Sequence, residues 1–324
     1  MVLHRPAKRS APRLGRRFDV VDGLRVHARE GGDGPAVVLV HGYGVSGRYM
    51  LPLARELAAG CTVLVPDLPG HGRSETPPET QDIGTLADAL GSWLEVVGVE
   101  RPVLVGNSMG CQVITELAVR RPELVGSLVL VGPTVDPAKR GARHQVFGAL
   151  RDSRNEPALL VALAAKDGAG WSFRRLLATA RSVLSDRMED RLPAIDCPAV
   201  VVHGEKDGLV SLDWAERVAT LLPRGRLVVL PGEPHAIPYT QPVLLGGIVR
   251  QLVIEEGEDA VGELARRLPH WHVASLHEHE AGSRQEALPL LGHPRGYQPI
   301  ALTNPSDPGS RRHASTIAAM ACVG

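Results

Sequence analysis

The chain contains 324 residues, of which 44% are hydrophobic, so it can bury a substantial core. Its 36 lysines and arginines balance its 36 aspartates and glutamates, and no global electrostatic field favours nucleic acid or an anionic membrane as a partner. No apolar run approaches the roughly 18 residues of a membrane helix, so we expect no membrane span.

The two ends of the sequence and its cysteines restrict the class of protein further. Residues 1–17 are basic but lack the apolar stretch of a secretory signal, and we expect a flexible N-terminal arm there. The four cysteines show no CxxC spacing, which favours neither a disulfide framework nor a zinc site. We therefore expect a cytoplasmic protein without a metal.

The predicted elements begin with a hairpin at Arg17–Arg29, where polar and apolar residues alternate around Asp22-Gly23. Six Val- and Leu-rich strands are predicted at Ala36–Val40, Thr62–Pro66, Pro102–Gly106, Ser127–Gly132, Ala199–Gly204 and Arg226–Gly232. Helical patterns lie near Gly47–Ala59, Gly84–Val97, Met109–Arg121, Asp213–Leu222 and Pro242–Glu255. This alternation predicts an α/β fold: a mostly parallel sheet with helices on both faces and an antiparallel edge.

The alternation is interrupted once, between residues 133 and 195, where Trp171–Leu184 is the clearest amphipathic piece. An insertion at the carboxyl edge of a parallel sheet lies over the place where such sheets bind ligands, so we predict a helical cap. The core is then residues 18–132 and 196–255.

From residue 256 the apolar pattern decays, and residues 256–324 are predicted to be a poorly ordered extension. A cluster of histidines in this extension does not have the spacing of a standard metal site. Its members are His270, His272, His277 and His279.

The segment Gly106-Asn107-Ser108-Met109-Gly110 matches G-x-S-x-G between a predicted strand and a predicted helix. Such a turn is tight enough that a side chain at Gly106 or Gly110 would collide with neighbouring backbone. The strained turn exposes the Ser108 hydroxyl as a nucleophile, and the N–H of Met109 can hold an oxyanion. The alternative is a serine that caps the helix.

The loop His41-Gly42-Tyr43-Gly44 follows the strand Ala36–Val40 directly. Glycines at Gly42 and Gly44 let the backbone approach a substrate carbonyl, and we predict Tyr43 N–H as the second oxyanion donor. The alternative is an ordinary turn between a strand and a helix.

A serine hydroxyl needs an adjacent base to attack at neutral pH. In this architecture an acid and then a histidine follow the serine, each in the loop after a later strand. Asp207 and His235 occupy those loops and are predicted to be the orienting carboxylate and the general base. Taken singly, Asp207 is also typical of a turn and His235 of a surface loop, and Glu205 and Asp136 are rival acids.

The motifs HGYG, DLPGHGRS, GNSMG, HGEKDGLV and GEPHAIPYTQP resemble those of the α/β-hydrolase superfamily in order and spacing, over roughly Phe18 to Glu255. The resemblance implies a serine hydrolase that cleaves an ester or related acyl bond of a small molecule through an acyl-enzyme. It implies no cofactor.

Other branches of that superfamily stay open. GNSMG is similar to the elbow of meta-cleavage-product hydrolases, which break carbon–carbon bonds, although Ala236 stands where those enzymes usually have Trp. Their cap arginine could be matched by Arg174 or Arg175. Cofactor-free haloperoxidases (perhydrolases) share the Ser, His and Asp pattern, and a ligand-binding receptor on the same fold is the non-enzymatic alternative. The sequence leaves the substrate and the oligomeric state open.

Overall fold

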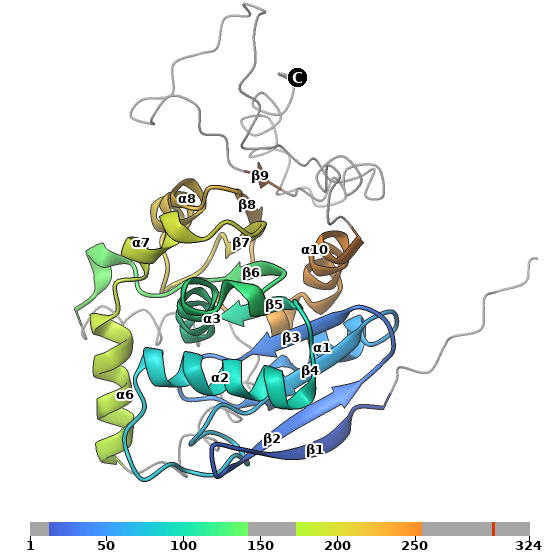
Figure 1. Cartoon of the computed structure of the whole chain (residues 1–324). Coiled ribbons are helices and arrows are strands. Elements are labelled where there is room, and N and C mark those ends of the chain that lie inside the picture. Colours follow the sequence, from blue (N-terminus) through green and yellow to red (C-terminus); the bar gives the residue numbers. More distant parts are fainter. Residues whose placement is uncertain (1–12, 142–172, 255–299, 302–324) are drawn as a thin grey trace, which may run out of the picture.

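The computed structural model describes residues 13–141, 173–254 and 300–301 (Figure 1). Its centre is one mixed sheet with the strand order β1-β2-β4-β3-β5-β6-β7-β8-β9. The strands are β1 Gly15–Val21, β2 Leu24–Gly31, β3 Ala36–Val40, β4 Thr62–Pro66, β5 Val103–Asn107, β6 Ser127–Val131, β7 Ala199–Gly204, β8 Gly225–Leu230 and β9 Ile300–Ala301.

All strand pairs from β4 to β9 are parallel, and only β1–β2 and β2–β4 are antiparallel. The predicted mostly parallel sheet with an antiparallel edge is therefore confirmed. The edge hairpin turns at Asp22 and Gly23, whose φ angles are +50° and +78°. Two consecutive positive φ angles are what a two-residue hairpin turn needs, which explains the Asp-Gly pair.

Helices cover both faces of this sheet, as predicted (Figure 1). The longer ones are α1 Leu51–Leu57, α2 Ile83–Val97, α3 Met109–Arg120, α6 Phe173–Ser185, α8 Leu212–Leu221 and α10 Pro242–Ile254. The shorter ones are η1 Gly47–Met50, η2 Pro122–Leu124, η3 Pro137–Lys139, α7 Met188–Arg191, η4 Leu192–Ala194 and α9 Ile237–Thr240.

The strands are apolar at nearly every position because successive side chains enter two different cores. Val38 and Val40 of β3 pack in one core with residues of α2, α3 and α8. Val37 and Leu39 pack in the other core with residues of α1 and α10.

One predicted domain boundary differs from the structure, and part of the domain division lies outside the described residues. Gly15, Arg16 and Arg17 belong to β1, so the sheet begins three residues before the predicted start of the core at residue 18. The interval 142–172 of the predicted cap, the arm up to residue 12, and residues 255–299 and 302–324 are not described. Strand β9 falls within the predicted C-terminal extension.

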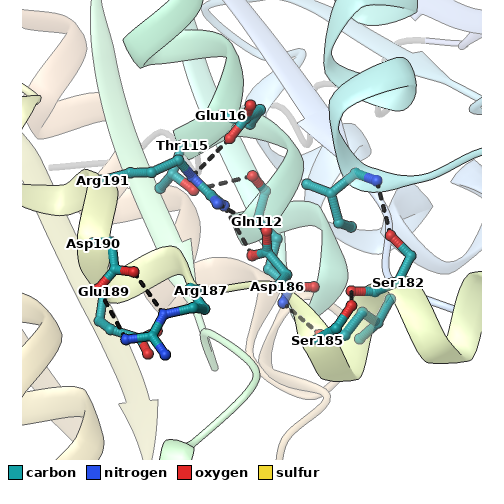
Figure 2. Close-up of polar contacts among 12 residues, drawn as sticks. Gln112, Thr115, Glu116, Ser182, Ser185, Asp186, Arg187, Glu189, Asp190 and Arg191 are labelled. Carbon is teal, nitrogen blue, oxygen red and sulfur yellow. Dashed lines mark hydrogen bonds and ion pairs between the residues drawn. The ribbon is translucent and has the colours of Figure 1, made fainter.

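The described part of the predicted cap is joined to α3, the helix that begins at Met109 (Figure 2). The side-chain amide of Gln112 donates to the carbonyl oxygen of Val183 at 3.0 Å. Arg191 pairs with Glu116 of α3 and with Asp186, each at 2.8 Å. These contacts attach the chain that returns from the insertion to the same helix that carries the elbow serine at its N-terminus.

Candidate active site

Ser108 stands at the turn between β5 and α3 with φ +56° and ψ −120°. Positive φ is uncommon for a residue with a side chain, and such strain concentrates at functional sites. Ser108 is the N-cap residue of α3, yet its side chain makes no capping hydrogen bond. The capping interpretation of this serine therefore fails, and its hydroxyl, on a partly exposed residue, is left for another role.

The glycines on either side of Ser108 let the turn form. A β-carbon at Gly106 would lie 2.6 Å from the carbonyl carbon of Gly110, far inside a normal contact. A β-carbon at Gly110 would collide with the carbonyl oxygen of Val40 on β3. Both positions need glycine because α3 begins against the backbone of the two strands beneath it.

The loop after β3 lies against the elbow. A β-carbon at Gly42 would lie 3.1 Å from the Ser108 β-carbon, so the missing side chain allows a close approach. Gly44 has φ +74°, a conformation that favours glycine. Burial raises the pKa of the Tyr43 phenol to about 12, so this side chain stays neutral, and its backbone N–H remains the predicted donor.

A buried polar cluster fixes that loop from below. His41 contacts the carbonyl oxygen of Gly42 through Nδ1 at 2.9 Å and accepts from Leu68 N–H through Nε2 at 3.1 Å. Asp67 accepts from Gly47 N–H at 2.8 Å and pairs with His27 at 2.8 Å. The histidine of the HGYG motif is thus a structural residue, and so is the aspartate of DLPGHGRS.

Asp207 and His235 come together at the carboxyl ends of β7 and β8. His235 Nδ1 lies 2.7 Å from Asp207 Oδ2, and the side chains are 7% and 0% exposed. The other carboxylate oxygen accepts from Leu209 N–H at 2.8 Å and Val210 N–H at 2.9 Å. Burial alone would raise the pKa of Asp207, but the charge and hydrogen bond of His235 and the Val210 N–H lower it below its ordinary value. The carboxylate is therefore ionised and can fix the tautomer of the ring.

The two rival acids are engaged elsewhere. Glu205 accepts from Gly232 N–H at 2.7 Å. Asp136 begins η3, where its carboxylate accepts from Ala138 N–H at 2.9 Å and from the Ser211 hydroxyl at 2.6 Å. Asp207 is the carboxylate that contacts His235.

Three residues without a role predicted from the sequence lie at the elbow or beside this pair. The Asn107 amide donates to the carbonyl oxygens of Val131 at 3.2 Å and His235 at 3.4 Å. Gly132 has φ +53°, and a β-carbon there would lie 2.8 Å from the His235 ring. The Thr134 hydroxyl lies 3.4 Å from the Ser108 hydroxyl. A glycine directly after a strand is the one sequence signal among them.

His203 of β7 is a further buried residue near the pair, with 2% of its surface exposed. Its pKa is lowered, chiefly by burial, although the charge of Asp207 acts in the opposite direction. The ring is therefore neutral at neutral pH and does not add a second positive charge beside His235.

Among the described residues, no group of three or more His, Cys, Asp or Glu side chains could hold a metal ion. His270, His272, His277 and His279 lie outside those residues. Within the same ranges, no helix is both long and apolar enough to cross a membrane. Of the two arginines considered for the cap, Arg175 donates to the carbonyl oxygens of Pro77, Pro78 and Glu79, and the side chain of Arg174 lies outside the described part of the chain.

Comparison with known proteins gives consistent matches. Residues 37–245 match the model of the alpha/beta hydrolase family. A 2-(acetamidomethylene)succinate hydrolase from Mesorhizobium japonicum is 26% identical over 254 residues, which cover 71% of this chain and 91% of that one. A putative non-heme chloroperoxidase from Synechocystis is 29% identical over 253 residues, covering 67% and 90%.

A solved structure of a membrane phospholipase A, described as a bacterial virulence factor, superposes with a TM-score of 0.67. It is 26% identical to this chain, and the match covers 74% of this chain and 86% of that one. Uncharacterised mycobacterial proteins are 36% identical over 127 residues, but the chain spans only 37% of their length.

Proposed function

The chain belongs to the alpha/beta hydrolase family, and on that premise we propose that it is a serine hydrolase acting on an ester or related acyl bond of a small molecule. Ser108 is the nucleophile, His235 the general base and Asp207 the carboxylate that orients it. The observation that carries the proposal is the 2.7 Å contact between Asp207 and His235, at the same sheet edge as a serine held at φ +56°.

The first half of the reaction forms an acyl-enzyme. His235 takes the Ser108 proton as Oγ attacks the substrate carbonyl, and Asp207 stabilises the imidazolium that results. The negative charge on the carbonyl oxygen is held by the backbone N–H groups of Tyr43 and Met109. Met109 is the first residue of α3, where the helix dipole adds to that stabilisation. His235 then gives the proton to the leaving group.

The second half releases the acyl group. Water gives a proton to His235 and attacks the acyl carbon, and Ser108 leaves and recovers its proton from His235. This chemistry uses side chains and backbone N–H groups alone. The predicted cap, residues 133–195, would cover the acyl site and select the substrate.

Perhydrolysis is the second candidate, because the Synechocystis relative is named as a putative non-heme chloroperoxidase. In that reaction hydrogen peroxide replaces water in the second half, and the same three residues serve. Carbon–carbon cleavage is the third candidate: Arg175 is engaged by three backbone carbonyls, which leaves Arg174 as the other arginine that could serve in the cap.

The test is hydrolysis of short-chain p-nitrophenyl esters by the wild-type chain and two serine variants. Ser108→Ala should abolish turnover. Ser185→Ala removes an exposed hydroxyl that donates to the Ser182 carbonyl oxygen, and it should leave turnover unchanged. Ester turnover that survives in Ser108→Ala would overturn the proposed nucleophile. A folded wild-type chain that binds esters without cleaving them would favour the receptor alternative.

A further inference from the structure

The Thr134 hydroxyl lies in hydrogen-bond range of the proposed nucleophile. Thr134 follows β6 by three residues, is 4% exposed, and has its Oγ1 3.4 Å from Ser108 Oγ. Within the described residues, this hydroxyl makes no other hydrogen bond. A buried hydroxyl usually has its hydrogen bonds made, so its orientation toward Ser108 calls for a reason.

The position of Thr134 is set by α8, independently of Ser108. The Trp214 indole N–H donates to the carbonyl oxygen of Pro133 at 2.9 Å, immediately before Thr134. On the other side, Asp136 accepts from the hydroxyl of Ser211, the residue that caps α8, at 2.6 Å. Val135 between them is buried. The backbone on both sides of Thr134 is thus fixed, and the hydroxyl is held in place before substrate arrives.

Thr134 and the loop that contains Tyr43 lie on opposite sides of the strand that ends just before Ser108. Strand β5, which ends at the elbow, lies between β3 and β6 in the sheet. The loop that contains Tyr43 follows β3, whereas Thr134 follows β6, on the same side as β7 and β8. From there the hydroxyl reaches Ser108 Oγ, whereas the proposed donor Tyr43 N–H approaches from the β3 side.

We propose that Thr134 is a further catalytic residue whose hydroxyl donates to Ser108 Oγ when that oxygen carries negative charge. The inference rests on the proposed function. Ser108 transfers its own proton to His235. The donor in the contact between Thr134 and Ser108 is therefore the Thr134 hydroxyl. At 3.4 Å the contact is longer than an ordinary O–H···O bond and is weak in the resting enzyme. A charged acceptor shortens and strengthens it, so its stabilisation is largest in the transition state.

The step that gains most is the release of the acyl group. Water adds to the acyl carbon after giving a proton to His235. The carbon–Oγ bond then breaks, the bonding electron pair moves to Ser108 Oγ, and His235 returns the proton to that oxygen. Thr134 keeps its own proton throughout and stabilises the departing oxygen. In acylation the same hydrogen bond occupies a lone pair of Ser108 Oγ and lowers the nucleophilicity of that oxygen. The rate of acylation therefore increases less than the rate of deacylation.

Stopped-flow hydrolysis of p-nitrophenyl acetate separates these steps, since the burst reports acylation and the steady phase reports deacylation. Thr134→Val keeps the shape and removes the hydroxyl, and it should slow the steady phase about ten- to a hundred-fold. The burst rate should change by less than about three-fold, because the donor affects acylation less. Thr134→Ser restores the donor and should return the steady phase to within about three-fold of wild type.

The proposal is overturned if Thr134→Val keeps the wild-type steady phase, if Thr134→Ser is as slow as Thr134→Val, or if burst and steady phases fall equally. Thermal melting of both variants checks that each is folded. A wild-type chain that turns over esters with Ser108 as nucleophile and is unaffected by Thr134→Val contradicts this inference alone. A wild-type chain without turnover contradicts the proposed function itself, and this inference with it.

Discussion

Two aspartate–histidine pairs of nearly equal geometry lie in this molecule. Asp207 and His235 are 2.7 Å apart at the ends of β7 and β8, and Asp67 and His27 are 2.8 Å apart beside β4 and β2. Both aspartates also accept backbone N–H groups, and both have a pKa below the ordinary value. Distance and ionisation therefore do not distinguish the two pairs.

The surroundings of the two aspartate–histidine pairs distinguish them. Asp67 accepts from Gly47 N–H and Arg73 N–H, each at 2.8 Å, and so ties together two loops. The His27 ring packs 4.9 Å from the Phe18 ring, and its Nε2 is buried without a hydrogen-bond partner among the described residues. The His235 ring instead lies against Gly132, which has no side chain. The backbone carbonyl oxygen of His235 accepts from the side-chain amide of Asn107, the residue before Ser108. One pair supports a loop, and the other is joined to a strained serine.

The two pairs should respond differently when each aspartate is neutralised by the same substitution. Asp207→Asn should lower kcat for ester hydrolysis about a thousand-fold or more while the fold persists, because the amide favours the wrong tautomer of His235. Asp67→Asn should instead lower the free energy of unfolding by about 3 kcal/mol, because it leaves a buried network unpaired.

Urea unfolding and steady-state kinetics on both variants give the two quantities. For Asp67→Asn we expect kcat within about ten-fold of wild type, since Asp67 contacts no reacting group. The comparison fails if Asp67→Asn loses as much activity as Asp207→Asn.

A smaller effect is expected where a side chain is added above the catalytic ring. Gly132→Ala places a β-carbon 2.8 Å from the His235 ring at φ +53° and should lower kcat about a hundred-fold. Gly98→Ala is the matched control, because Gly98 ends α2 at φ +70° with nothing within 4 Å.

The control should lose only about 1 kcal/mol of stability and no activity, because only backbone strain is added. Steady-state kinetics with thermal melting would decide, and equal activity of the two variants would remove Gly132 from the site.

The buried polar cluster around Asp67 and His41 should also make the stability of the protein depend on pH, through His71. Burial lowers the pKa of His71 from 6.5 to about 3, and the charge of His41 acts in the same direction. A histidine whose pKa is lower in the folded than in the unfolded state favours unfolding once the pH falls below the pKa of the unfolded chain, because only the unfolded chain then binds the proton. The stability present above that pKa is therefore lost as the pH falls toward the pKa of the folded state. We expect the free energy of unfolding of the wild-type chain to fall by up to about 1.4 kcal/mol per pH unit below the pKa that His71 has in the unfolded chain.

His71→Asn removes the titrating group and should flatten the profile between pH 6.5 and about 3. Denaturant titrations at several pH values measure the slope. An unchanged slope in the variant would contradict a buried neutral His71.

The smallest effect is expected from the acid beside Asp207. Glu205 accepts from Gly232 N–H and does not contact His235 in the structure. Glu205→Gln should therefore keep kcat within about three-fold of wild type, as a surface substitution commonly does. A loss as large as that of Asp207→Asn would identify the wrong carboxylate as the partner of His235.

Much of the sheet could be predicted because its strands are buried on both faces and read as short apolar runs. The predicted strands Ala36–Val40, Thr62–Pro66 and Ala199–Gly204 coincide with β3, β4 and β7. The hairpin predicted from Arg17 does not include the first two residues of β1, because Gly15 and Arg16 are exposed and give no apolar signal.

The tertiary contacts of the site were less predictable. The Asp207–His235 contact was expected from the order of the loops, whereas the Asp67–His27 contact depends on the antiparallel pairing of β2 with β4 across 40 residues. Thr134 carries no motif, and its place beside Ser108 is set by Trp214 and Ser211, which are remote in sequence. Such contacts arise from packing that no local pattern encodes.

Ser108, and not a serine near the second pair, is the proposed nucleophile. A fluorophosphonate probe followed by peptide mass spectrometry tests it directly, since the probe forms a covalent bond with an activated serine. We predict one modified residue, Ser108, and no labelling of Ser108→Ala. Modification at Ser74, which lies beside Asp67, or a folded wild-type chain that takes up no probe, would contradict the account.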